Sequence, residues 1–220
     1  MNEQHSLGWF RSRLGKITGS KVGVLMKNGK KNIFTEEAMS YIYHLAAERT
    51  MAEQVVNDDF NFESYLECTR VETRAMRFGT EMESVARERY CTLNNVVCLD
   101  MPLCAHKTIE NFGSSPDGLT DKNVTLEIKC PNQSTFMKYR HRIDDDASLL
   151  MVNPEYYYQC MAHMMCTGSE RTDFIVFSPF QKDNIHIVPI YPNELIFRNI
   201  ESRVKLANEL IDEIISTKHQ

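Results

Sequence analysis

The sequence has no long run of hydrophobic residues and no apolar segment at its start. A membrane-spanning helix needs about 20 consecutive apolar residues, and a secretory signal needs an apolar core. We therefore expect neither a membrane helix nor export, and we predict a protein of the cytoplasm of a bacterial or other host cell. Internal repeats, low-complexity tracts and long linkers are missing too. The 220 residues, 42% of them hydrophobic, favour a single domain over residues 1–220.

Paired cysteine motifs are also missing. The seven cysteines are odd in number, and none has the CxxC spacing. This pattern favours reduced thiols, most of them buried, over a disulfide framework. A zinc protein stays as an alternative, although the usual zinc-ligand spacing is not present.

An overall positive charge is absent as well, since the net charge is −5. The charge is nevertheless unevenly distributed. Residues 6–31 contain seven basic residues and no acidic one, which leaves 18 basic and 30 acidic residues elsewhere. A local basic stretch in acidic surroundings suits a protein that grips a polyanion at one place. A solvated N-terminal face explains the same charges equally well.

The periodicity predicts an α/β (α+β) fold with a central mixed β-sheet flanked by helices. Two helices separated by a Gly-containing turn are expected within residues 7–26, and further helices near residues 35–50, 78–90, 154–168 and 195–214, with a polar loop over 57–63. The last helix is predicted to be amphipathic, with Leu195, Ile196, Ile200, Val204, Ala207, Leu210, Ile211 and Ile214 on one face. Strands are expected in VVCLDMPLCA, TIENFGSS, VTLEIKC, TDFIVFSPF and NIHIVPIY. Thr35 and Asn153 are predicted helix caps, and Gly168 is a predicted helix stop.

The stretch SSPDGLTDKNVTLEIKCP, residues 114–131, carries the strongest chemical signal. Residues two apart in a strand share a face, so Glu127 and Lys129 lie together, opposite Leu126 and Ile128. They are either an ion pair on a wet strand face or part of a site. Asp117, in the preceding turn, could lie beside Glu127 if the segment forms a hairpin. Two carboxylates beside a lysine make a hard oxygen site for Mg²⁺ or Mn²⁺.

A third carboxylate comes from the helix FGTEMESVARERY. Its apolar stripe includes Val85 and Tyr90, and Glu83 lies on the flank of that stripe, whereas Glu81 lies well off it. Glu83 is therefore predicted to point inward and Glu81 to face water. The alternative for Glu83 is a surface ion pair with Arg87, four residues on.

Several stretches together resemble the lambda-exonuclease or YqaJ-type viral recombinase family of the PD-(D/E)XK nuclease superfamily. They are WFRSRLGKITGSKV, FGTEMESVAR, SSPDGL with LEIKCP, and YYYQCMAHMM, in the family's order over residues 9–166. The resemblance implies a restriction-endonuclease-like core. It also implies a metal-dependent exonuclease that digests linear double-stranded DNA from 5′ to 3′ and leaves 3′ single strands for phage-type recombination.

The resemblance also assigns residues. It implies that Asp117 and Glu127 bind the metal with the Ile128 carbonyl, that Glu83 completes the carboxylates, and that Lys129 orients or activates water. It places Gln159 near the active site, and Arg13 and Ser20 at the phosphate of the DNA end. For Ser20, a plain helix-capping role is the alternative. His163 lies one turn after Gln159 and could face the same cleft, but the resemblance gives it no role, and we predict that it packs in the core.

The implied cofactor is one or two Mg²⁺ ions per site, for which Mn²⁺ can substitute. The implied partners are linear duplex DNA, a single-strand annealing protein and further copies of the chain in a trimer. Two alternatives to the exonuclease stay open: an endonuclease of the same superfamily, and a non-catalytic DNA-binding module with this fold.

Overall fold

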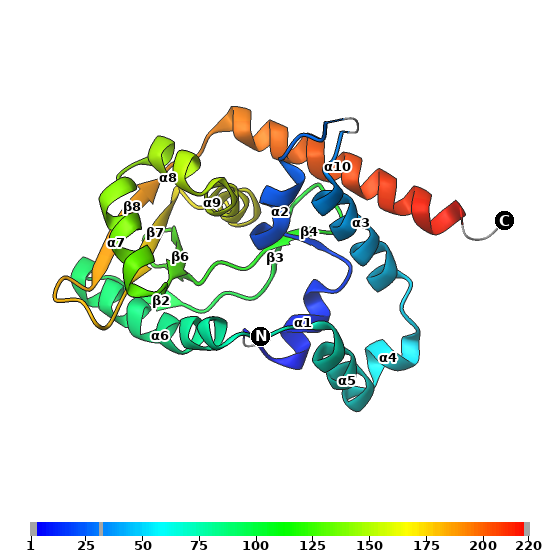
Figure 1. Cartoon of the computed structure of the whole chain (residues 1–220), viewed down its shortest axis with the longest axis horizontal. Helices are drawn as coiled ribbons and strands as arrows, with labels where there is room; N and C mark the ends of the chain where they lie inside the picture. Colours follow the sequence, from blue (N-terminus) through cyan, green and yellow to red (C-terminus); the bar gives the residue numbers. More distant parts are fainter. Residues whose placement is uncertain (1–3, 31–32, 218–220) are drawn as a thin grey trace.

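Helices surround a five-stranded mixed β-sheet in the computed structural model, which describes residues 4–30 and 33–217 (Figure 1). The strand order is β2-β5-β6-β7-β8, in which β6 and β7 are parallel and the other neighbours antiparallel. A second sheet has the order β1-β4-β3. The strands are β1 Ile17–Thr18, β2 Cys98–Leu99, β3 Cys104–Ala105, β4 Phe112–Ser114, β5 Gly118–Thr120, β6 Val124–Lys129, β7 Arg171–Phe177 and β8 Ile185–Ile190. The predicted mixed α/β class is confirmed.

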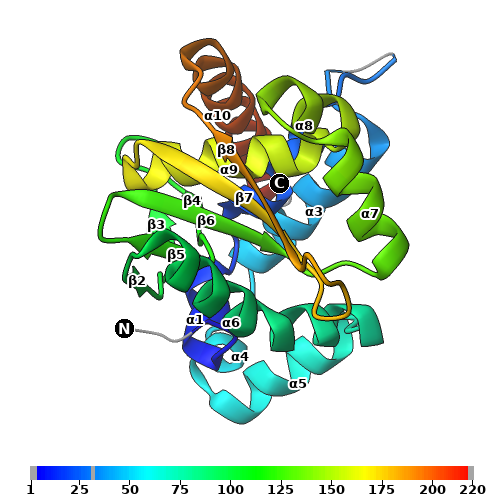
Figure 2. The ribbon, with the colours of Figure 1, turned by 90° about the vertical axis from the view of Figure 1, so that its left-hand side faces the viewer.

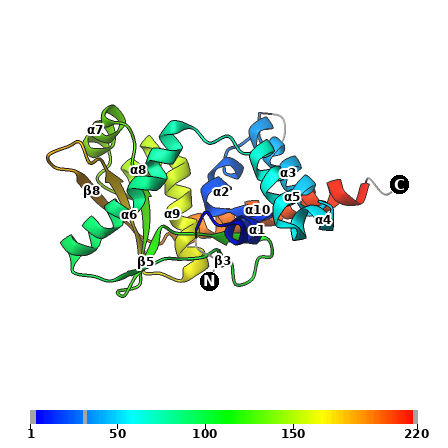
Figure 3. The same cartoon turned by 90° about the horizontal axis from the view of Figure 1, so that it is seen from below.

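The helices gather around the sheets in two groups. The helices α1, α3, α4, α5 and the end of α10 lie at one end of the molecule, and the five-stranded sheet with α6, α7 and α8 lies at the other (Figures 1 and 3). Between them, α2 packs against α9. The bounds are α1 Leu7–Arg13, α2 Gly19–Leu25, α3 Glu36–Arg49, α4 Glu53–Asn57, α5 Asp59–Thr69, α6 Arg74–Asn94, α7 Gln133–Arg142, α8 Asp146–Val152, α9 Pro154–Thr167 and α10 Glu194–Thr217.

Strand β6 is covered on both faces, with α6 on one side and α9 on the other (Figure 2). Its residues Val124, Leu126 and Ile128 pack with Ala86 and Tyr90 of α6. On the opposite face, Thr125 and Glu127 are fully buried. A wet strand face, the structural alternative for the Glu127–Lys129 pair, is therefore wrong. The residue order alone could not show this, because burial of the second face depends on α9, which begins 25 residues after the end of β6.

The predicted helix ends are largely confirmed. The Thr35 side chain accepts a hydrogen bond from the Ala38 amide, and Asn153 accepts one from the Tyr156 amide. Gly168 ends α9 with a φ of 75°, a left-handed conformation that favours glycine.

Three local expectations are wrong. The predicted loop over residues 57–63 is mostly helix, because the Asp58 side chain caps α5 and Phe62 anchors it in the interior. Val85 was assigned to the apolar stripe of α6, yet its exposed fraction is 43%. Leu195 was assigned to the apolar face of α10, but it is 64% exposed near the start of that helix, while Ile200, Val204 and Ile211 are buried as expected.

The seven cysteines are free thiols, as expected. Only Cys160 and Cys166 are buried, however, and Cys68 is exposed. The expectation that most of them are buried is therefore wrong. Across the described parts of the chain, no helix combines the length and apolar character that crossing a membrane requires.

Candidate active site

The β5–β6 hairpin brings Asp117 next to Glu127, as the sequence predicted. The Asp117 amide donates to the Leu126 carbonyl at 2.9 Å, and its Oδ2 accepts from the Ile128 amide at 2.6 Å. Gly118 pairs with Leu126 across the hairpin. These contacts fix the turn aspartate against the strand that carries Glu127 and Lys129.

Glu127 is fully buried, and both of its carboxylate oxygens have cationic or hydrogen-bonding neighbours. Oε1 forms an ion pair with the Lys129 ammonium, and Oε2 lies 2.6 Å from His163 Nε2. The Lys129 side chain is 26% exposed, and its ammonium lies 4.9 Å from the centre of the Tyr156 ring. The predicted Glu127–Lys129 pair therefore lies at the edge of the interior, with the lysine nearer to solvent.

Glu83 of α6 lines a cavity together with Asp117. It is partly buried, whereas Glu81 is exposed, as their positions relative to the apolar stripe predicted. Arg87 does not form the alternative ion pair with Glu83. Its guanidinium instead contacts the Asp100 carboxylate and donates to the Asp117 carbonyl at 3.1 Å.

A cleft of about 140 Å³ joins the residues that the sequence placed at the carboxylates and at the phosphate. Its lining includes Arg13, Ser20, Glu83, Asp117 and Gln159. Gln159 is only 8% exposed. Glu127, Ile128 and Lys129 do not line this cleft; they lie beside Asp117 on β6. Five of the predicted site residues thus share one cavity. The other three are consecutive on β6, where the Ile128 amide contacts Asp117 and Glu127 pairs with Lys129.

Arg13 is aligned by three contacts at the rim of the cleft. Its guanidinium donates to Ser115 Oγ at 3.0 Å and to Ser20 Oγ at 3.3 Å, and it lies 4.2 Å from the Trp9 ring centre. The N-cap of α2 is Thr18, so the capping alternative for Ser20 is wrong. Ser20 instead presents its hydroxyl beside the arginine.

A second cavity, of about 640 Å³, shares Trp9, Arg13 and Ser20 with the cleft and adds Lys16, Lys21 and Arg70 to its lining. The predicted basic stretch is thus divided. Arg13, Lys16 and Lys21 line the cavities, whereas Arg11 pairs with Asp59 and Lys27 with Glu37 and Glu155. Lys31 lies outside the described residues.

The carboxylates differ in their readiness to ionise. Burial, followed by repulsion from Asp117, raises the pKa of Glu83 to about 8. Burial and repulsion from Glu127 raise the pKa of Asp117 to about 6. For Glu127, burial opposes ionisation, but the Lys129 charge and the His163 hydrogen bond outweigh it and lower the pKa of that carboxyl. Burial disfavours the Lys129 ammonium too, yet Glu127 and Asp117 raise its pKa.

The raised pKa of Glu83 predicts how the stability of the metal-free protein depends on pH. In the unfolded chain Glu83 loses its proton near its ordinary value of 4.5, whereas the folded protein keeps the proton up to about pH 8. The folded state therefore binds more protons between these values, and the free energy of unfolding falls as pH rises through them. Urea unfolding in EDTA from pH 5 to 8 measures this slope.

Glu83→Gln is expected to reduce the slope, because glutamine has no proton to lose. Glu81→Gln, an exposed position two residues away, serves as the matched control and should leave the slope unchanged. An equal slope in the parent and Glu83→Gln would contradict the perturbed environment of Glu83.

The family model of the YqaJ-like viral recombinase domain matches residues 8–170. The chain belongs to this YqaJ-like family. The match includes every residue that the sequence assigned to the site, from Arg13 to Gln159.

Solved structures agree with the YqaJ-like assignment. The alkaline exonuclease LHK-Exo from Laribacter hongkongensis is 27% identical, with a TM-score of 0.77 and coverage of 97% of this chain and 96% of that one. Its complex with dAMP gives a TM-score of 0.76 at 27% identity, with coverage of 96% and 95%. A phage-related exonuclease from Haemophilus somnus, 15% identical, shares the fold with a TM-score of 0.65 and coverage of 92% and 96%. No curated protein matches the sequence.

The YqaJ-like site contains carboxylates suited to a divalent cation, but these side chains are not arranged around one metal position. In the described parts of the chain, no three His, Cys, Asp or Glu side chains already lie in an arrangement that could hold a metal ion. Glu127 is engaged by Lys129 and His163, and Asp117 by the Ile128 amide. The donor chemistry nevertheless fits Mg²⁺ or Mn²⁺. The carboxylates are hard oxygen ligands, and a cation would relieve the mutual repulsion that, after burial, raises the pKa of Glu83 and Asp117.

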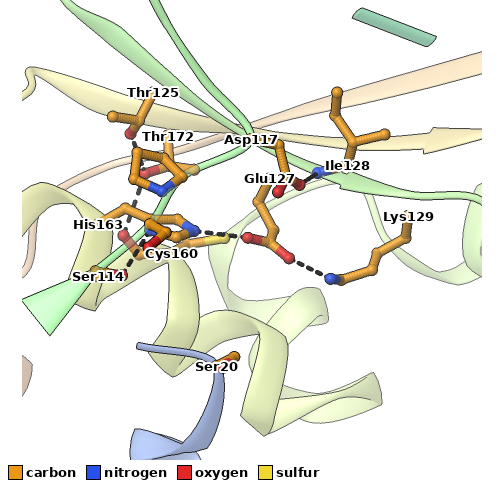
Figure 4. Close-up of polar contacts among 12 residues, drawn as sticks. Ser20, Ser114, Asp117, Thr125, Glu127, Ile128, Lys129, Cys160, His163 and Thr172 are labelled. Atoms are coloured by element: carbon orange, nitrogen blue, oxygen red, sulfur yellow. Dashed lines mark hydrogen bonds and ion pairs between the residues drawn. The ribbon is translucent and has the colours of Figure 1, made fainter. Parts of the chain in front are cut away.

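The prediction that His163 packs in the core is confirmed, since its side chain is fully buried. Sequence reasoning missed its contacts, because His163 hydrogen-bonds to Glu127 and to Ser114 Oγ, which lies 2.7 Å from Nδ1 (Figure 4). Its position one turn after Gln159 places both side chains on one side of α9. Only the tertiary structure shows that this side meets Glu127.

Proposed function

We propose that this chain is a metal-dependent exonuclease that digests linear double-stranded DNA from the 5′ end and leaves 3′ single strands. The observation that carries the proposal is the cleft in which Glu83 and Asp117 face Arg13 and Ser20. Carboxylates suited to a divalent cation and a cation suited to a phosphate thus meet in one small volume. Similarity to the Laribacter exonuclease over nearly the whole chain supports the same activity.

The metal would be held by Glu83, Asp117, Glu127 and the Ile128 carbonyl. A bound divalent ion would stabilise the charge that develops on the phosphoryl and leaving oxygens. Lys129, whose pKa is raised, would act as an ammonium that orients the attacking water and offsets negative charge, rather than as a base. Gln159 would hydrogen-bond to the substrate from the wall of the cleft.

Arg13 and Ser20 would bind the terminal 5′-phosphate, and the larger cavity beside them would receive the adjacent nucleotide. Its lysines and arginines suit the phosphates of a nucleic acid, and its aromatic rings suit the bases. The dAMP complex of the Laribacter exonuclease supports a deoxynucleotide as the ligand class.

The proposal is tested with linear duplex DNA labelled at the 5′ or the 3′ end, with Mg²⁺ or with EDTA, next to a closed circle. We expect Mg²⁺-dependent release of the 5′ label from linear DNA only. Cutting of the circle would favour the endonuclease alternative. DNA binding without cutting in Mg²⁺ or Mn²⁺ would favour the non-catalytic module, and stoichiometric zinc would revive the zinc protein.

Arg13→Ala is expected to remove a preference for 5′-phosphorylated over 5′-hydroxyl ends. A hydrogen bond to a charged group contributes about 1.5–3 kcal/mol, so kcat/KM on phosphorylated ends should fall by about 10–100-fold. Arg11→Ala is the matched control, because Arg11 lies on the same helix but pairs with Asp59 at 2.5 Å. Equal losses on both kinds of end, or a loss in Arg11→Ala alone, would contradict the phosphate role of Arg13.

Family membership also leads us to propose a trimer, a single-strand annealing protein as partner, and action in the cytoplasm of the host cell. Light scattering coupled to size-exclusion chromatography tests the trimer. If the protein is a monomer at the concentration at which it cuts DNA, the trimer proposal is wrong.

A further inference from the structure

Glu127 presents a problem that the proposed metal site alone does not solve. Its side chain is fully buried, and a buried carboxylate without partners is strongly disfavoured. The Lys129 ammonium contacts only Oε1. The other oxygen, Oε2, is bound from the opposite side by His163 of α9 (Figure 4).

The direction of this hydrogen bond is fixed by chemistry. An ionised carboxylate only accepts, so His163 Nε2 carries the hydrogen and donates it to Glu127 Oε2. The other ring nitrogen, Nδ1, lies 2.7 Å from Ser114 Oγ. Both His163 and Ser114 are fully buried, so water does not compete for either contact.

Helix α2 packs closely against Ser114, at the position of Gly19. A Cβ atom on Gly19 would lie 2.0 Å from Ser114 Oγ and 3.3 Å from the Ala162 Cβ. Only glycine therefore allows α2 to lie against both the Ser114 hydroxyl and α9. Gly19 directly precedes Ser20, which lines the cleft. The contacts thus run from the phosphate side of the site, through Ser114 and His163, to Glu127.

We propose that His163, oriented by Ser114, is a positioning residue that fixes the Glu127 carboxylate for metal binding. By occupying Oε2, it leaves Oε1, the oxygen on the Lys129 side, as the one that Glu127 can offer to a cation. Partners of this kind orient metal ligands, and their loss typically weakens metal affinity or activity by about 10–100-fold. The inference rests on the proposed metal-dependent function.

The competing explanation is that His163 only satisfies a buried carboxylate and so stabilises the fold. The two explanations differ in what the folded variant does. A positioning residue changes cation affinity in molecules that are folded, and a donor at the same place restores that affinity. A stabilising residue changes the midpoint of unfolding and leaves the affinity of the folded molecules unchanged.

The test is calorimetric titration of the full chain with Mn²⁺ in the absence of DNA, alongside thermal unfolding. His163→Phe removes the donor and keeps much of the volume. His163→Gln keeps an N–H near the position of Nε2. Ser114→Ala releases the far side of the ring and serves if His163→Phe does not fold. Thr172→Val is the matched control, since Thr172 is fully buried and bonds to Thr125 and Cys160 but not to Glu127.

We expect His163→Phe to weaken Mn²⁺ binding by about 10–100-fold, Ser114→Ala to weaken it less, and His163→Gln to bind within a few-fold of the parent. Thr172→Val should unfold at lower temperature and bind Mn²⁺ normally. Parent-like affinity in folded His163→Phe or in Ser114→Ala would overturn the positioning role, as would an equal loss in His163→Gln. If the parent itself bound no Mn²⁺, the proposed function would fail, and this inference with it.

Discussion

Lys129→Ala is expected to lose DNA cleavage by about 10²–10⁴-fold, the usual range for a group that assists proton transfer or water at the reacting centre. The variant should still bind duplex DNA, because Arg13, Lys16 and Lys21 line a cavity that does not include Lys129. Single-turnover cleavage of end-labelled linear DNA measures the loss, and filter binding in EDTA measures the affinity.

Lys129→Ala also leaves the buried Glu127 with His163 as its remaining partner, so the midpoint of thermal unfolding should fall. The Lys129 side chain is 26% exposed, so water can reach the space it leaves and limit this loss. Lys122→Ala is the matched control. Lys122 is an exposed lysine in the turn of the same hairpin, and its ammonium contacts only the Asn94 carbonyl, at 3.5 Å. Cleavage by Lys129→Ala at the rate of Lys122→Ala would show that the strand lysine has no part in the reaction.

Asp117→Asn is expected to abolish cleavage in Mg²⁺ while preserving the hairpin. The asparagine oxygen can still accept from the Ile128 amide, as Asp117 Oδ2 does at 2.6 Å, so the backbone contact survives. The lost charge is the one that a divalent cation needs. A contribution of several kcal/mol from the metal corresponds to a decrease in rate of about 10³-fold or more.

The same substitution should leave DNA binding in EDTA unchanged or tighter, since it removes a negative charge from a cleft that receives phosphate. Asp121→Asn, at an exposed aspartate four residues later whose carboxylate accepts from the Val97 amide, is the control. If Asp117→Asn cleaves DNA in Mg²⁺ at a rate close to that of Asp121→Asn, Asp117 is not a metal ligand.

The features predictable from the sequence were those set by local spacing. Alternation placed Glu127 and Lys129 together, the Pro-Asp-Gly turn placed Asp117 against them, and helical spacing separated Glu83 from Glu81. Each of these depends on a few neighbouring residues and on the fixed geometry of a strand, a turn or a helix.

The features that escaped prediction depend on contacts between distant segments. The burial of the Glu127 face of β6 depends on α9, and the hydrogen bonds of His163 depend on the packing of α9 against Ser114 and Glu127. Helix α5 was missed for a related reason. Its polar first residues are typical of a loop, and the helix forms because Asp58 caps it and Phe62 is buried in the interior.

The central claim is that Asp117 and Glu127, with Glu83, hold a divalent cation beside Lys129. Anomalous diffraction from crystals of this protein soaked in Mn²⁺ tests it most directly, with Asp117→Asn crystals as the control. We predict an anomalous peak within about 2.5 Å of carboxylate oxygens of both Asp117 and Glu127, and its loss in Asp117→Asn. No peak at these residues at saturating Mn²⁺, or a peak that persists unchanged in Asp117→Asn, would contradict the account.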